Sequence, residues 1–111
     1  MSDVEILQLA AKAIGGVYDQ LTECITFDGG LNYEQWEPLS NLSHALNLRH
    51  RLHLKTGFDG RFFGLCAYAT YPTGPDSCNS IMQNVEEAGG KRAALRRAIV
   101  CAAAEMGKAK S

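Results

Sequence analysis

Residues 52–70, LHLKTGFDGRFFGLCAYAT, decide the fold. A two-residue Asp-Gly loop between strand-like runs is a strong β-hairpin signal, and Asp59-Gly60 lies between two such runs. We therefore predict a hairpin of residues 52–58 and 61–70. If Phe58 pairs with Arg61, the pairs that share one face of the ribbon are Thr56 with Phe63, Leu54 with Leu65, and Leu52 with Ala67. The other face is mixed, which is typical of a sheet that helices cover on one side.

Three helices are expected around this hairpin. The first covers about residues 3–15, because Ser2 and Glu5 form a capping box and Gly15-Gly16 ends the apolar periodicity. A second covers roughly 41–50, capped by Ser40 or Asn41. The third covers about 91–107 and is rich in alanine, so that a sheet or helix can approach its backbone closely.

Two segments are less regular. Residues 24–27 predict one short strand before the turn at Asp28-Gly29-Gly30. Turn-forming residues predict a loop over 71–77, followed by a short helix that carries Ile81 and ends at Gly89-Gly90. The expected fold is α+β, a single domain of residues 1–111. In it a small antiparallel sheet of about three strands packs with N-terminal, middle and C-terminal helices.

Composition places the chain among ordinary globular proteins. Of its 111 residues, 46% are hydrophobic and 21% are charged. No apolar run is long enough to cross a bilayer, and the first twenty residues contain no secretory signal. We therefore expect a cytoplasmic protein, in which the four cysteines stay free thiols rather than form two disulfides. None forms a C-x-x-C pair, which argues against a zinc knuckle or a thioredoxin-type redox motif.

The net charge of −1 conceals three segments of different sign. Residues 1–48 contain seven acids and one base, whereas residues 49–61 contain four bases and one acid, and residues 91–111 contain six bases and one acid. Such segregation is found on surfaces that bind polyanions, and also in folds whose segments neutralise one another.

The sequence offers little for catalysis or for metal binding. The predicted register places His53 opposite Cys66, but a metal needs three or four converging ligands, and a reactive thiol needs an orienting third group. His44 and His50 complete no such set. We expect no metal site, no cofactor, no catalytic residue and no enzymatic activity.

Two binding surfaces remain as candidates. One is basic and would bind nucleic acid or nucleotides, with Phe62 as a stacking surface; its residues are Arg49, Arg51, Lys55, Arg61, Lys91, Arg92 and Arg96. The other would hold a protein partner through exposed aromatic anchors, chiefly Trp36, Tyr68 and Tyr71. An uncovered edge strand would also allow a homodimer.

Three blocks of the sequence resemble a family of small uncharacterised phage and prophage proteins, of the phage ABA-sandwich type. The blocks are Leu7–Ala13, Trp36-Glu37-Pro38-Leu39 with Ala45-Leu46-Asn47-Leu48, and Arg96–Gly107. The resemblance implies helices packed around a small antiparallel sheet and a phage setting in a bacterial host, and it transfers no catalytic residue. We therefore expect a non-enzymatic accessory protein that binds a host or phage partner, with interference in host defence as one outcome. The alternative is the nucleic-acid- or nucleotide-binding module.

Overall fold

The computed structural model describes residues 2–60 and 64–110. Its three long helices confirm the predicted ones, with the middle helix extending to Leu52. The Ser2 hydroxyl accepts a hydrogen bond from the backbone N–H of Glu5 at 3.3 Å, and Asn41 caps the middle helix in the same way. A further short helix ends at Gly89, as predicted, in a left-handed conformation with φ of 93°. The helices are α1 (Asp3–Ala13), α2 (Leu42–Leu52), α3 (Val85–Ala88) and α4 (Lys91–Ala109).

The strands form two antiparallel sheets rather than the one that the sequence predicted. Sheet A has the order β1-β2-β3 and sheet B the order β4-β5-β6. The predicted strand at 24–27 is the middle strand of sheet A. The strands are β1 (Val17–Asp19), β2 (Cys24–Thr26), β3 (Glu34–Gln35), β4 (Lys55–Asp59), β5 (Cys66–Gly74) and β6 (Ser77–Asn84).

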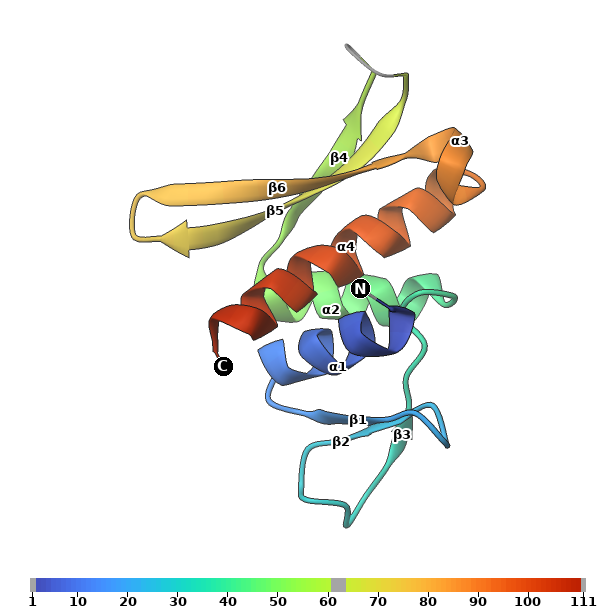
Figure 1. Ribbon diagram of the computed structural model, residues 1–111, viewed down its shortest axis with the longest axis vertical. Coiled ribbons are helices and arrows are strands. Elements are labelled where there is room, and N and C mark those ends of the chain that lie inside the picture. The colour runs from blue at the N-terminus through green and yellow to red at the C-terminus, as the bar shows by residue number, and fades with distance from the viewer. Residues whose placement is uncertain (1, 61–63, 111) are drawn as a thin grey trace.

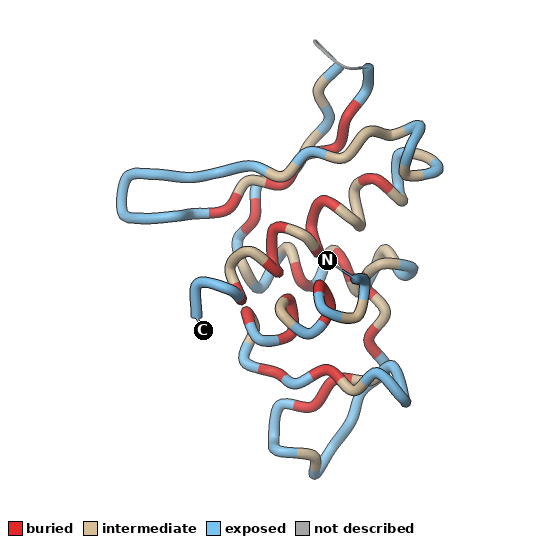
Figure 2. The backbone as a smooth tube through the Cα atoms, in the orientation of Figure 1, coloured by how far each residue is buried: buried red, intermediate tan, exposed pale blue. Residues whose placement is uncertain are grey.

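The two sheets enclose the helices, so the class is α+β as predicted but the order of layers is not. Figure 1 shows sheet B at one end of the long axis, then α4, then α1 and α2, and sheet A at the other end. Each sheet turns one face to the helices, and Figure 2 shows that the buried strand residues lie in β1, β2 and β5. Sheet A was missed because its outer strands have only three and two residues.

The hairpin of β4 and β5 exists, but its predicted register was wrong. Phe58 pairs with Ala67 instead of Arg61, a shift of six residues, and the two-residue turn at Asp59-Gly60 does not form because Asp59 pairs with Cys66. Leu52 belongs to α2, and Leu54 precedes β4. Because the shift is an even number, Thr56 and Ala67 still share one face, as alternation requires.

The expected loop over 71–77 was wrong, and of the helix expected after it only the last turn, α3, exists. The chain instead continues β5 to Gly74, turns at Pro75-Asp76 and returns as β6, so that Ile81 lies in a strand. The turn residues were correctly recognised, but the strand pairing on both sides of them was not. Residues 72–80, which we call the arm, are all exposed and extend beyond the helices as a two-stranded ribbon (Figure 2).

The core between the layers is built largely from small side chains of α4. Ala94, Ala98, Ala102 and Ala103 have no exposed surface, and they pack with larger residues of α1, α2 and the sheets. Because alanines fill little volume, the few large side chains of the chain are needed inside. None of the helices within residues 2–60 and 64–110 is long and apolar enough to cross a membrane.

Candidate partner-binding surface

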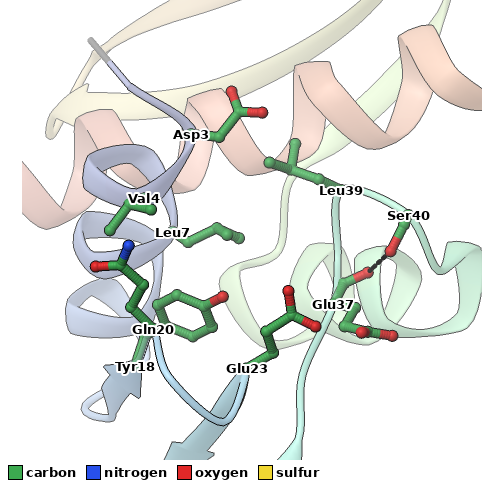
Figure 3. A pocket seen from close by; sticks show the side chains of 9 residues that line it. All are labelled: Asp3, Val4, Leu7, Tyr18, Gln20, Glu23, Glu37, Leu39 and Ser40. Carbon is green, nitrogen blue, oxygen red and sulfur yellow. Dashed lines mark hydrogen bonds between the residues drawn. The ribbon is translucent and has the colours of Figure 1, made fainter.

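A cleft of about 380 Å³ opens where sheet A meets the start of α1. The first turn of α1, the end of β1 with its following turn, and the segment before α2 each contribute three residues to it (Figure 3). We call it the acidic cleft, and its lining is Asp3, Val4, Leu7, Tyr18, Gln20, Glu23, Glu37, Leu39 and Ser40.

The acidic cleft carries an excess of negative charge. Asp3 is paired with Arg97 at 3.2 Å, whereas the side chain of Glu23 points toward the phenol of Tyr18 in Figure 3. Burial raises the pKa of the Tyr18 phenol, and the carboxylates of Glu23 and Glu37 raise it further, so the phenol stays a neutral hydrogen-bond donor. These groups suit an ammonium or guanidinium group.

The backbone of Glu23 is held in an unusual conformation beside this cleft. Its φ of 55° lies in the left-handed region, which non-glycine residues seldom adopt. The backbone N–H of Trp36 donates to the Glu23 carbonyl at 3.0 Å, and this bond ties the turn after β1 to the segment before α2. Two walls of the acidic cleft are therefore joined by a hydrogen bond between backbone groups.

Large apolar side chains are exposed at one end of sheet A, opposite the turn that lines the acidic cleft. Val17 is 66% exposed, Phe27 43%, Leu31 83% and Tyr33 53%. Val17 pairs with Thr26, the neighbour of Phe27, so Val17 and Phe27 lie on opposite faces at the same end of the sheet. Leu31 and Tyr33 lie in the loop from β2 to β3 at that end. We call these four residues the apolar patch.

Two further residues lie around this surface, one beside Phe27 and one at the other end of sheet A. The guanidinium of Arg51, at the end of α2, lies 4.7 Å from the centre of the Phe27 ring. At the opposite end of sheet A, Leu21 is 94% exposed in the turn between Gln20 and Glu23, two residues that line the acidic cleft. Exposed apolar residues therefore occur at both ends of sheet A, and the acidic cleft lies at one of them. Isolated apolar residues within turn segments were the sequence signal for this surface.

Two of the three predicted aromatic anchors are not available for binding. Trp36 is only 7% exposed and packs against Tyr18, with ring centres 5.8 Å apart, and Tyr71 is 8% exposed within the core. Tyr68 is half-buried on the outer face of sheet B, where its ring lies over Gly57 so closely that a Cβ there would come within 2.7 Å of the phenol oxygen. The expectation that Trp36 and Tyr71 are exposed was therefore wrong, because a core of alanines needs such large side chains.

The predicted basic residues do not form one surface. Arg49 donates to the Thr56 hydroxyl at 3.2 Å, and Arg96 donates to the Leu39 carbonyl at 2.9 Å, so both hold the fold together. Arg51 and Lys55 are exposed around the end of α2. The exposed Lys91 and Arg92 begin α4 beside α3, and Figure 1 shows this start of α4 away from the end of α2 and the start of β4. Arg61 and Phe62 lie outside the described residues.

Two of the three histidines also serve the fold. His44 Nδ1 accepts the backbone N–H of Glu37 at 2.9 Å, and His53 ends α2 with φ of 54°. Cys66 lies opposite Asp59 rather than His53, so the predicted pairing was wrong. Within the described part of the chain all four cysteines are free, and no group of three or more His, Cys, Asp or Glu side chains is arranged to hold a metal ion.

Comparisons with protein-family models, with curated proteins and with solved structures found no match to this chain. The resemblance to phage proteins stays a prediction, and the site must be interpreted from its own chemistry.

Proposed function

We propose that this chain is a non-enzymatic binding protein that holds a protein partner on sheet A. The observation that carries the proposal is the apolar patch, which lies on the same small sheet as the acidic cleft. Most large apolar side chains of a folded protein avoid water, so an exposed group with a polar surround is typical of interaction sites. The partner would be a protein with an apolar contact surface and a basic side chain for the cleft.

The acidic cleft supplies orientation and the apolar patch supplies most of the affinity. Apolar residues that become fully desolvated dominate binding energies, whereas charges at the rim mainly steer association and select partners. Glu23 and Glu37 would contact a lysine or arginine side chain of the partner, since Asp3 is already engaged with Arg97. The Tyr18 hydroxyl lies in the same cleft as a hydrogen-bonding group.

The biological setting of the proposal rests on the resemblance of the three sequence blocks to phage and prophage proteins. In that setting the partner is a host or phage protein, and occupation of a host defence protein would inhibit it. Such inhibition would be stoichiometric and saturable, without turnover. The site of action would then be the cytoplasm of the bacterial host.

The alternative is binding of nucleic acid or nucleotides through basic residues. The exposed Arg51 and Lys55 favour it, because they lie near each other in sequence and close to the end of α2. The engagement of Arg49 and Arg96 within the fold weighs against it. Phosphate contacts would make the binding fall steeply with salt concentration, whereas an apolar protein interface would respond weakly.

The test is affinity capture from infected and uninfected host lysates, with and without nuclease. We expect a specific protein to be retained after nuclease treatment by the wild-type chain and to be lost with Leu31→Ser. Leu31 is 83% exposed, so this change should leave the fold intact. Leu65→Ser, the same change at a residue 38% exposed beside sheet B, is the matched control and should retain the protein.

The outcomes separate the two functions. Loss of all captured material on nuclease treatment would support nucleic-acid binding and contradict the proposal. Equal capture by wild type and Leu31→Ser would also contradict it, because the apolar patch would then contribute nothing to binding. Glu23→Gln should weaken capture without abolishing it, since it removes one charge of the acidic cleft and none of the apolar contacts.

A further inference from the structure

The outer edge of sheet B is an open strand with an unusual composition. β6 stands at the end of the order β4-β5-β6, and its eight residues SCNSIMQN include no charge and no proline. Proteins ordinarily protect long edge strands with charged residues, proline or bulges, because unpaired backbone groups invite another strand. The part of β6 that would meet a neighbour lacks the first two of these devices.

The ladder between β5 and β6 identifies the backbone groups that face this edge. The N–H of Val85 donates to the Leu65 carbonyl at 2.9 Å, which makes Leu65 and Val85 a hydrogen-bonded pair. Such pairs alternate in an antiparallel ladder, so odd-numbered residues of β6 bond to β5, and Cys78, Ser80 and Met82 point their N–H and C=O groups away from it. Within the described residues, the N–H of Ser80 donates to the side chain of its neighbour Asn79 at 3.0 Å.

A groove of about 230 Å³ runs along the inner side of the same edge. It is lined by Ile6 of α1, by Ile81 and Gln83 of β6, and by Cys101, Ala104 and Glu105 of α4. No residue of β5 lines it, so the groove lies on the side of β6 that faces away from the rest of sheet B. Its one carboxylate, on Glu105, is paired with Lys108 at 3.0 Å.

We propose that two copies of this chain pair antiparallel through β6, about a two-fold axis at Ile81. In this register Ser80 of each copy exchanges backbone hydrogen bonds with Met82 of the other, and Ile81 meets its own symmetry mate as a closely spaced non-hydrogen-bonded pair. The axis is perpendicular to the sheet, so the helices of both copies stay on one side. The result is a continuous sheet of six strands above two facing apolar grooves.

The second copy is the occupant that fits this edge, for two reasons. Two copies of the uncharged β6 can lie side by side without repulsion, whereas β6 has no charge that would favour a charged strand of another protein. The arm supplies the second reason, since a two-stranded ribbon is marginally stable by itself in water. In the proposed register residues 77–80 of one copy lie beside residues 82–85 of the other, where the inner face is half-buried against the helices.

The test compares Ser80→Pro with Ser80→Ala by sedimentation equilibrium. Proline removes the outward N–H, whereas alanine keeps it and removes only the hydroxyl that bonds to Thr70 at 2.7 Å. We expect wild type and Ser80→Ala to have twice the chain mass of 12.1 kDa. Ser80→Pro should bind itself about a hundredfold more weakly, because the dimer loses two hydrogen bonds worth up to about tenfold each.

A second measurement keeps the proposal testable if Ser80→Pro does not fold. In the wild type the amide hydrogens of Cys78, Ser80 and Met82 should exchange more slowly as protein concentration rises. A wild type that stays monomeric near millimolar concentration would overturn the proposal, and so would a folded Ser80→Pro that remains dimeric. Protection of these amides only in complex with a captured protein would assign the edge to that protein and overturn self-pairing.

Discussion

Replacing Gly107 by alanine should destabilise the protein, although alanine is the better helix former. Gly107 is buried in the last turns of α4, where the backbone of Leu9 in α1 crosses it. A Cβ built on Gly107 would collide with the carbonyl oxygen of Leu9 and would lie only 2.7 Å from its carbonyl carbon. A backbone carbonyl cannot rotate aside as a side chain can, so α1 or the end of α4 would have to move.

The size of the effect follows from two opposing contributions. In the interior of a helix, glycine to alanine is worth about 0.5–1 kcal/mol of stabilisation. Forcing an extra carbon into a packed contact costs typically about 1–3 kcal/mol, and a contact with backbone belongs at the upper end. Unwinding of the last turn offers little relief, because Lys110 donates to the Ala13 carbonyl at 2.7 Å and secures that end to α1. We expect a net loss of about 1–2 kcal/mol.

Urea denaturation followed by circular dichroism measures this loss. With a slope of about 2 kcal/mol per molar for a chain of this size, the midpoint should fall by about 0.5–1 M. Gly107→Val should lower it further, while Lys108→Ala, at the exposed neighbouring position, should change the free energy of unfolding by less than about 0.5 kcal/mol. A midpoint for Gly107→Ala equal to or above that of wild type would refute the close approach of α1 and α4.

Three further predictions concern titratable groups. Hydrogen bonds from Asn32 lower the pKa of Asp28 to about 2. The stabilisation by this carboxylate is therefore full above about pH 4 and is lost as the pH falls through about 2. The Asn32 amide resonance should titrate with a midpoint near 2, and a midpoint near 4 would contradict the bonding. Burial and the nearby carboxylates raise the pKa of Tyr18, so one phenol should ionise above the ordinary value of about 10 in a spectrophotometric titration of the folded protein. Burial raises the pKa of the Cys101 thiol despite the nearby Arg97, whereas Cys78 is exposed. A disulfide reagent at about pH 8 should therefore modify Cys78 much faster than Cys101. Equal rates of modification would argue against the burial of Cys101.

Local signals in the sequence were sufficient to place the helices. The Ser2 hydroxyl, the Asn41 side chain and the left-handed Gly89 act through bonds within a few residues, and such bonds form whatever the rest of the chain does. The register of β4 and β5 is different, because it depends on distant packing. Ala67 and Ala69 have no exposed surface, and their burial decides the pairing over the local preference of Asp59-Gly60 for a tight turn.

The binding surface was harder to predict than the fold, for the same reason. Trp36 and Tyr71 have the chemistry of interface anchors, but only the volume left by the alanines of α4 reveals that the core needs them. The local sequence around Leu31 indicates a turn and gives no sign of a binding role. Its 83% exposure depends on a sheet that the sequence did not predict. Residue type indicates what a side chain can bind, whereas the packing of the whole chain decides whether it is accessible.

Because of the order of layers, the apolar patch on sheet A and the β6 edge of sheet B do not obstruct each other, yet dimerisation at one affects binding at the other. Sheet A and sheet B lie at opposite ends of the long axis, with the helices between them (Figure 1). Pairing through β6 therefore leaves the apolar patch of both copies open, and the dimer would be bivalent toward any partner that carries two sites. Avidity then requires the dimer, whereas the affinity of a single site does not. Ser80→Pro should accordingly weaken binding to a surface-immobilised partner and leave binding to a monovalent one unchanged, while Leu31→Ser should weaken both.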